Sequence, residues 1–382
     1  MMMWPDRRFL DLFGIELPIV QAPMANASTV DMAVAVAKAG ALGSFPCAAL
    51  TDDKIVAGVA EIRSRTNRPI NLNFFCHKPA PPDEARDAAW LERLSPYYVE
   101  LGAEMPKVPL KASIVPFTAA TCAVVEELAP AVVSFHFGLP DAELVTRVKA
   151  VGCKVISSAT SLREARALAE RGVDAIIAQG AEAGGHRGMF IETDIATQIE
   201  TLALVHEIVD AVRLPVIAAG GIVDGRDIAA AFALGATGVQ IGTAYLGCPE
   251  ATISRLHRAA LAEPDRQTVI TSVLSGRPAR GILTRFVREQ GPINEAIPNY
   301  PLATPALTPL RAKAEATGSP DFSLLWAGQS RAPSRNMGAG ELTKALAQES
   351  LVELRRLASS RVVAKPRREM PKARRVWPQP RA

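Results

Sequence analysis

The sequence has few cysteines, and they lack the spacing of a metal site or a disulfide framework. The five cysteines of this 382-residue chain are Cys47, Cys76, Cys122, Cys153 and Cys248. They are odd in number, dispersed, and never form a CxxC pair. This pattern excludes a zinc ribbon and a disulfide-stapled fold, and it predicts reduced, mostly buried thiols in a cytoplasmic protein.

The sequence also lacks a segment with the composition of a membrane span. Residues 228–249 carry no charge, but they include four glycines, two threonines and a glutamine. That composition predicts the end of a helix, a turn and a strand rather than a transmembrane helix. The N-terminus interrupts its apolar residues with charges every few positions, which excludes a signal peptide.

Basic charge is absent from most of the chain. The net charge is +4, but residues 365–382 alone carry +6, which leaves the remainder near −2. Because residues 1–364 have no excess of basic charge, nucleic acid is not expected as a partner. The basic end predicts a disordered, solvated tail.

Several catalytic motifs are missing. No GxGxxG follows a strand, which disfavours a Rossmann dinucleotide fold. HExxH and GxSxG do not occur, and no pair of carboxylates stands out as an acid and base. The chemistry must therefore rest on other groups.

What the sequence does contain is a repeated alternation of short β-branched runs and alanine-rich amphipathic stretches, which predicts βα units and a parallel sheet. The eight strand candidates are 18–24, 41–46, 69–75, 131–137, 154–159, 174–180, 215–221 and 238–246. Eight such units favour an α/β fold of the (β/α)8 TIM-barrel type, with an open doubly wound sheet as the alternative.

The repeat stops near residue 250, which suggests further domains. We expect the barrel to span residues 1–249 and a smaller helical cap to span residues 250–325. Residues 326–362 are expected to return to the barrel, with an amphipathic helix over 340–358. The basic tail would occupy residues 363–382.

Polar residues and glycines follow most of the predicted strands. Asn73, His136 and Gln179 follow three of them, and the Gly220–Gly221 pair follows a fourth. A barrel places its site at these strand ends. Glycines after the seventh strand and on the eighth predict a phosphate site made of backbone N–H groups, helped by a helix that begins near Asp224.

A phosphate-anchored cofactor on a barrel without GxGxxG favours FMN over NAD. Pro23 and Met24 end the first strand and could lie flat against an isoalloxazine ring. The amides of Asn73 and Gln179 could bond the polar edge of that ring.

One histidine lies among four glycines in "AQGAEAGGHRG" (178–188). An imidazole such as His186 can accept a proton from carbon or, once protonated, hold an anion. We expect the glycines to let cofactor and substrate approach. His206 and His257 lie in helical patterns and are expected at the surface. Cys76 and His77 are adjacent on a strand, so they face opposite ways and cannot act as a pair.

The motifs "QAPMA", "NFFCH", "SFHFG", "AQGAEAGGHRG", "PVIAAGGI" and "GVQIGTAYL" resemble those of the nitronate monooxygenase family, formerly 2-nitropropane dioxygenases, and in particular its class I branch. The resemblance runs from about residue 14 to 330 and includes "GRPAR" and "LWAGQ". It implies FMN on a (β/α)8 barrel with a smaller helical domain. It also implies oxidation of alkyl nitronates, such as propionate 3-nitronate, by O2 to a carbonyl compound and nitrite.

Carried onto this sequence, the resemblance makes His186 the catalytic histidine and His136 a second catalytic residue in the same pocket. The implied FMN contacts are Ala22, Pro23, Met24, Asn73, Gln179, Gly184, Gly221, Gln240, Gly242, Thr243 and Gln329. The family uses several tyrosines around the substrate, whereas this chain has only four. Of these, Tyr300 is the plausible pocket member, accompanied by Lys313.

Other functions are compatible with the same residues. An NAD(P)H-dependent flavin reductase, of the enoyl-ACP reductase or quinone reductase kind, could share the fold and cofactor. A flavin-holding scaffold would not need His186. Both a monomer and a homodimer are compatible with the sequence.

Overall fold

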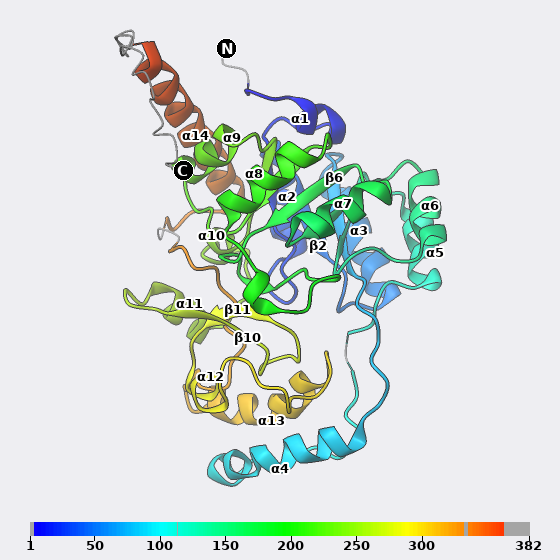
Figure 1. Ribbon diagram of the computed structural model, residues 1–382, viewed down its shortest axis with the longest axis vertical. Coiled ribbons are helices and arrows are strands. Elements are labelled where there is room, and N and C mark those ends of the chain that lie inside the picture. The colour runs from blue at the N-terminus through cyan, green and yellow to red at the C-terminus, as the bar shows by residue number, and fades with distance from the viewer. Residues whose placement is uncertain (1–3, 113, 332–334, 363–382) are drawn as a thin grey trace, which may run out of the picture.

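Eight parallel strands form a barrel, in the order β1-β9-β8-β6-β5-β4-β3-β2 (Figure 1). The computed structural model describes residues 4–112, 114–331 and 335–362. The barrel strands are β1 (Ile19–Gln21), β2 (Gly43–Pro46), β3 (Ile70–Phe75), β4 (Val132–His136), β5 (Lys154–Ala159), β6 (Ala175–Gln179), β8 (Val216–Ala219) and β9 (Gly238–Ile241). A parallel bridge from Val20 to Leu42 joins β1 to β2 and closes the circle. The predicted barrel is confirmed, and the doubly wound alternative is wrong.

Each predicted strand is present, but the last is shorter than expected. It ends at Ile241, because Thr243–Leu246 forms the short helix α10 after Gly242. The barrel strands are almost fully buried, as expected for a parallel sheet covered by helices.

Helices surround the barrel. They are α2 (Val30–Lys38), α3 (Asp52–Arg65), α5 (Ala119–Leu128), α6 (Ala142–Ala150), α7 (Leu162–Glu170), α8 (Thr201–Ala211) and α9 (Gly225–Ala233). The eighth position is filled by α14 (Ala339–Val362), which packs against α9 and α2 after a long excursion of the chain. The predicted helix over 340–358 is therefore confirmed.

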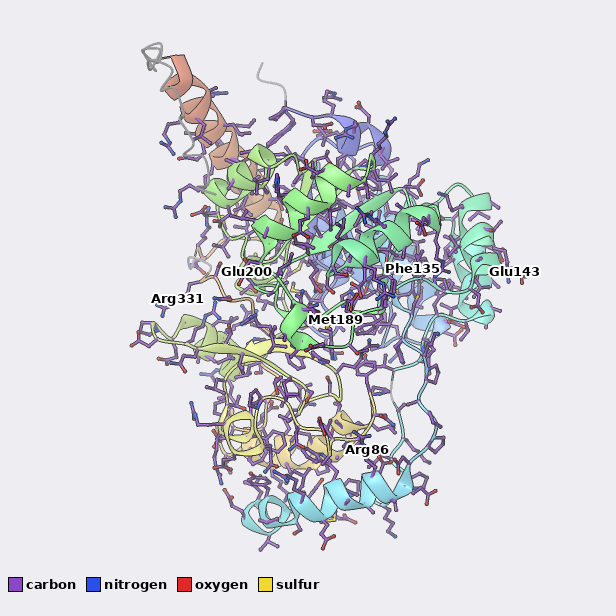
Figure 2. All side chains as sticks on the ribbon, viewed as in Figure 1. Arg86, Phe135, Glu143, Met189, Glu200 and Arg331 are labelled. Atoms are coloured by element: carbon purple, nitrogen blue, oxygen red, sulfur yellow. The ribbon has the colours of Figure 1, made fainter. Side chains whose placement is uncertain are left out.

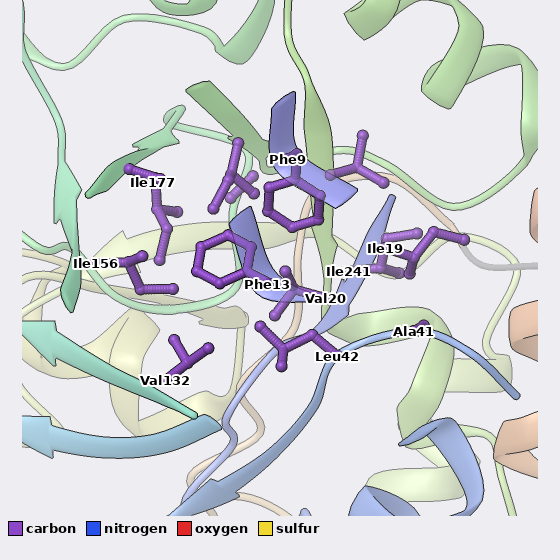
Figure 3. Packing of buried hydrophobic residues seen from close by; sticks show 14 of the residues in the cluster. Phe9, Phe13, Ile19, Val20, Ala41, Leu42, Val132, Ile156, Ile177 and Ile241 are labelled. Carbon is purple, nitrogen blue, oxygen red and sulfur yellow. The ribbon is translucent and has the colours of Figure 1, made fainter. Parts of the chain in front are cut away.

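The short helix α1 (Arg8–Phe13) covers the amino end of the barrel. Its residues Phe9 and Phe13 are buried beside Ile19, Ile177 and other strand residues (Figure 3). A Cβ at Gly238 would lie 3.0 Å from the ring of Phe9, so only glycine allows the helix this close.

A second lobe lies beyond the carboxyl ends of the strands (Figure 1). Its three-stranded antiparallel sheet has the order β10 (Thr268–Thr271), β11 (Ala279–Ile282), β7 (Gly185–His186). Its helices are α11 (Arg255–Ala262), α12 (Arg285–Gln290) and α13 (Ala303–Ala316). The cap expected over residues 250–325 is therefore not helical throughout, since it also contains the strands β10 and β11.

The helix α4 (Glu84–Leu101), from the barrel segment between β3 and α5, joins the core of this lobe. Trp90 and Leu94 of α4 are buried with Phe286, Leu307 and other residues of α12 and α13. Arg86 of α4 donates from Nε to the carbonyl of Ile297 at 2.7 Å (Figure 2). The lobe thus draws on residues from both sides of position 250, and the four-part domain division stays a prediction.

The remaining bulk expectations can be compared with the described residues. All five cysteines are free, and all but the half-buried Cys76 are buried, as predicted. None of the helices in the described ranges is long and apolar enough to cross a membrane. The predicted tail at 363–382 lies outside the described residues.

Candidate active site

A cavity of about 690 Å³ lies where the barrel meets the second lobe. Its barrel wall comes from residues at the carboxyl ends of the strands, including Asn73 and Gln240, where barrel sites are found. Its opposite wall includes Tyr300 and Trp326. The two lobes therefore build one enclosed space.

All but two of the predicted site residues line this cavity. They are Ala22, Pro23, Met24, Asn73, His136, Gln179, Gly184, His186, Gly221, Gln240, Gly242, Thr243 and Tyr300. The roles assigned to them stay predictions, but the structure brings them together.

Gln329 and Lys313 do not line the cavity. The side chain of Gln329 is exposed, and its backbone N–H donates to the carbonyl of Glu182 at 2.9 Å. Its neighbours Gly328 and Ser330 line the cavity instead. Lys313 is exposed on α13, whereas Arg311 and Glu315 reach the cavity. The expected roles of Gln329 and Lys313 are therefore corrected.

His186 is held by a strand of the second lobe. It lies on β7, where it pairs with Ala279 of β11, and Gly185 before it has a φ of +76°. Its Nε2 lies 2.9 Å from the hydroxyl of Ser275, which donates to the carbonyl of Arg277 at 3.2 Å. Because the Ser275 hydroxyl directs its proton to that carbonyl, its oxygen accepts from Nε2–H of His186. His186 therefore carries its proton on Nε2 and a lone pair on Nδ1.

No protein group in the described part of the chain bonds Nδ1 of His186. This nitrogen is thus available to a substrate. Burial, then the charges of His136 and Arg277, lowers the pKa of His186 to about 3. The imidazole is therefore neutral at physiological pH.

Both ring nitrogens of His136 are bonded within the protein. Nε2 lies 3.1 Å from the carbonyl of His186, and Nδ1 lies 3.1 Å from the hydroxyl of Ser158. A carbonyl only accepts, so Nε2 carries the proton and Nδ1 accepts from Ser158. Burial is the largest cause that lowers the pKa of His136, to about 4. The geometry gives His136 a positioning role rather than the predicted catalytic one.

The side chain of Gln179 is also bonded to the loop that carries His186. Its Nε2 donates to the carbonyl of His186 at 3.0 Å, and its Oε1 accepts from the N–H of Gly188 at 2.7 Å. Gln179 thus lines the cavity with one amide N–H and its oxygen bonded to this loop, and its hydrogen bonds to a flavin ring stay a prediction. Asn73 donates to the hydroxyl of Ser134 at 3.0 Å, and its Oδ1 has no partner among the described residues.

Arg187, which the sequence analysis did not single out, holds the same loop from behind. It is 1% exposed and donates to the carbonyls of Gly180 and Gln179, both at 2.6 Å. Its adjacency to His186 in the "GGHRG" motif was the only sequence signal for it.

The loop glycines are needed for contacts within the protein. A Cβ at Gly184 would lie 2.5 Å from the backbone nitrogen of Gly328, and one at Gly188 would lie 3.0 Å from the ring of His136. The prediction that these glycines serve the approach of cofactor and substrate is thus only part of the reason. Groups of the protein itself, Gly328 and His136, already pack against these two glycines.

Aromatic rings surround His186. The ring centroids of Tyr300 and Trp326 lie 5.3 and 5.4 Å from it. His77 is buried edge-on against Tyr300 at 4.9 Å, which the sequence analysis did not foresee. His257 is also buried, with Nε2 3.1 Å from the carbonyl of Trp326, so its expected place at the surface is wrong.

Three of the four tyrosines lie away from the cavity. Tyr97 and Tyr98 pack in the core of the second lobe, and Tyr245 bonds Thr343 of α14 at 2.7 Å. Among the described residues, Tyr300 is the tyrosine that lines the cavity. Burial raises the pKa of its hydroxyl above the ordinary value, and this hydroxyl has no hydrogen-bond partner within the described residues.

The N-terminus of α9 does not offer its first N–H groups to an anion. The helix begins at Gly225 as expected, but Asp224 accepts from the N–H groups of Arg226 and Asp227 in a capping box, and Glu349 accepts from that of Gly225. Gly221 and Gly242, with a φ of +71° at Gly221, line the cavity nearby. The backbone N–H groups of Gly221 and Gly242 are not bonded to other described groups. These two loops are therefore the candidate phosphate cradle.

The comparisons with known proteins agree with this geometry. A family model described as "Nitronate monooxygenase" matches residues 6–349. The chain is 43% identical to a nitronate monooxygenase of Paraburkholderia phytofirmans, over 92% of this chain and 98% of the relative. It is also 43% identical to a nitronate monooxygenase of Pseudomonas aeruginosa, over 90% and 98%.

A solved nitroalkane oxidase of Streptomyces ansochromogenes superposes with a TM-score of 0.84 at 36% identity, covering 92% of this chain and 99% of that one. FabK from Thermotoga maritima is more distant, with a TM-score of 0.70 and 28% identity over 92% and 98%. The family model and the relatives agree: the chain belongs to the nitronate monooxygenase family.

Proposed function

We propose that the protein binds FMN in this cavity and oxidises alkyl nitronates with O2 to a carbonyl compound and nitrite. The observation that carries the proposal is a neutral imidazole, His186, with a free nitrogen in a cavity that ends in unbonded loop amides. The relatives named nitronate monooxygenase support the same reaction.

The residues of the cavity fit FMN. The buried Oε1 of Gln240 lacks a partner among the described groups, and flavin N–H or ribityl hydroxyl groups are suitable donors. A Cβ at Gly242 would meet Ala22 and Met24 no closer than 3.5 Å, so the space above this glycine is open. Loop amides near Gly221 and Gly242 would hold the phosphate, and Pro23 and Met24 would cover the ring.

Bound FMN would supply the electron acceptor that the reaction requires. The protein's own part is proton transfer and orientation. Where a neutral nitroalkane is bound, Nδ1 of His186 would take the proton from the carbon next to the nitro group and so form the nitronate that is oxidised. Protonation of a buried imidazole is unfavourable alone, but the nitronate anion formed beside it offsets that cost.

Tyr300 would orient the substrate. Its hydroxyl, unbonded in the described structure and protonated because its pKa is raised, would donate to a nitronate oxygen beside His186. Arg277 adds positive charge nearby, since its guanidinium carbon lies 4.2 Å from the ring centroid of Phe137 and 5.9 Å from that of Tyr300. Both would favour an anionic substrate.

The test uses the purified protein. We expect flavin absorbance, FMN in the supernatant after denaturation, and nitrite from propionate 3-nitronate with matching O2 uptake. In anaerobic stopped flow, the nitronate should bleach the flavin and NADPH should not. Rapid bleaching by NADPH alone would instead favour the flavin reductase alternative, and a protein that binds no FMN would contradict both.

A further inference from the structure

A polar stripe on α13 forms the part of the cavity wall that the proposed chemistry does not use. Thr304, Thr308, Arg311 and Glu315 all line the cavity. Their spacing of four, three and four residues places them on one face of a helix. The apolar residues Leu307, Leu310 and Ala314 pack into the lobe core from another face.

The stripe begins beside the reacting end of the cavity and leads away from it. Thr304 donates to the carbonyl of Leu274 at 3.2 Å, next to Ser275, which bonds His186. With a rise of 1.5 Å per residue, the backbone of Arg311 lies roughly 10 Å further along the helix. A ligand that extends along α13 from His186 would therefore meet Arg311 with its remote end.

Among the described residues, Arg311 has one weak partner. Its Nε lies 4.0 Å from Oε1 of Glu315, which is too long for a hydrogen bond. That carboxylate oxygen already accepts from the hydroxyl of Ser323 at 2.7 Å. The guanidinium therefore keeps donors that a carboxylate could engage in a bidentate manner.

Arg277, a second cation near the cavity, is committed. Arg277 donates to the carbonyl of Met189 at 2.7 Å and stacks on Phe137. Met189 itself lies in the segment between the two lobes (Figure 2). A remote anionic group of a bound substrate would meet Arg311 rather than Arg277.

We propose that Arg311 forms a subsite for a carboxylate at the far end of the substrate. This inference rests on the proposed function and adds a substrate class: nitronates whose carboxylate is separated from the reacting carbon by a chain of several methylenes. Binding energy from this remote contact would orient the reacting end against His186.

The test compares ω-nitronate carboxylates of increasing chain length with uncharged alkyl nitronates of the same length. In the wild type, kcat/KM for the carboxylates should rise with chain length relative to the neutral series. Arg311→Met should lower this preference about tenfold, the size of one charge-assisted hydrogen bond, and Arg311→Lys should keep part of it. Lys313→Met, at an exposed cation two residues away, is the matched control and should change nothing.

Glu315→Gln gives an opposite expectation. Removing the carboxylate that competes for Arg311 should raise the preference for carboxylate substrates. Equal changes with charged and neutral substrates in Arg311→Met, or a carboxylate preference that is greatest for the shortest chain, would overturn the proposed subsite.

A binding measurement separates this inference from the proposed reaction. Alkanoates without a nitro group are titrated into the flavin-loaded protein, and the change in visible flavin absorbance gives Kd. Loss of affinity in Arg311→Met, without nitronate turnover in the wild type, would support the subsite and contradict the reaction. Unchanged alkanoate affinity with normal turnover would support the reaction and contradict the subsite.

Discussion

The imidazole of His136 donates its Nε2 proton to the backbone carbonyl of His186, at 3.1 Å, and makes no bond to the ring of that residue. Gln179 donates to the same carbonyl at 3.0 Å. Side chains on two barrel strands, β4 and β6, thus hold the backbone of the proposed base, whereas its ring bonds Ser275 of the second lobe. This relationship separates the residue proposed to react from those that hold its backbone.

Replacement of His186 by asparagine tests the base. With neutral nitroalkanes, kcat/KM should fall about a hundredfold or more, because general base catalysis contributes that much. With preformed nitronates the loss should be smaller, since no carbon proton has to be removed. Steady-state O2 uptake with both forms of one substrate gives the comparison, and equal losses would argue against a base.

His136→Asn should behave differently, because His136 positions the backbone of His186. Activity should fall by a similar factor with nitroalkanes and nitronates, as expected when an aligned geometry is lost. His136→Gln, which can still donate to the carbonyl, should recover part of it. A selective loss with nitroalkanes would instead assign the proton transfer to His136.

Ser275→Ala tests the tautomer of His186. Without the hydroxyl at 2.9 Å, Nε2 loses its acceptor, so the proton is free to occupy Nδ1. We expect about a tenfold lower kcat with nitroalkanes, with a changed pH profile and nearly unchanged KM. Ser272→Ala, at a buried serine of the same segment, serves as the control. Identical pH profiles in Ser275→Ala and wild type would contradict this role.

Gly242→Ala tests the cofactor cradle with little effect on the fold. The added methyl group would meet Ala22 at an ordinary contact distance of 3.5 Å, so the cofactor-free protein should keep its stability. FMN affinity, measured by fluorescence quenching, should fall at least tenfold, because the methyl group enters the space assigned to the cofactor. Unchanged affinity would place the flavin elsewhere.

The buried histidines should make the protein sensitive to acid. Burial lowers the pKa of His77, His136 and His257 to about 4 and that of His186 to about 3. Between pH 6.5 and about 4 the unfolded chain therefore binds more protons than the native one, and the free energy of unfolding falls as pH falls. Each such proton contributes about 1.4 kcal/mol per pH unit.

Denaturant unfolding between pH 7 and pH 5, at saturating FMN, measures this slope. His257→Gln should lower this slope by the contribution of about one proton, or about 1.4 kcal/mol per pH unit. His257 is suited to this test because it lies in the cavity wall and is not the proposed proton acceptor. His206→Gln, at an exposed histidine, should leave it unchanged. A slope that His257→Gln does not alter would contradict the assignment.

The barrel could be predicted because each of its strands carries a local signal. Apolar runs such as 174–180 are buried on both faces, and the residue that follows them is placed at the site by the fold alone. The same rule placed Asn73, His136 and Gln179 at the cavity. It could not say that the amide of Gln179 and Nε2 of His136 bond the loop of His186, because that loop is ordered by contacts from β11 and Arg187.

The second lobe was harder to predict, because its core joins segments far apart in sequence. Trp90 of α4 meets Phe286 of α12, and β11 pairs with a strand of only two residues. The sequence contained enough information to choose Arg311 rather than Lys313. The apolar spacing of Leu307, Leu310 and Ala314 fixes the buried face of α13, and the adjacent positions, including Arg311, then face the cavity.

The two-residue strand β7 has a mechanical consequence. His186 is hydrogen-bonded edge to edge with β11 of the second lobe, while its carbonyl is fastened to the barrel, where the flavin is expected to lie. The distance between proton acceptor and electron acceptor is therefore fixed by how the two lobes dock. A substitution at their contact, far from every atom that touches substrate, would shift that distance and slow turnover while leaving the cavity chemically intact.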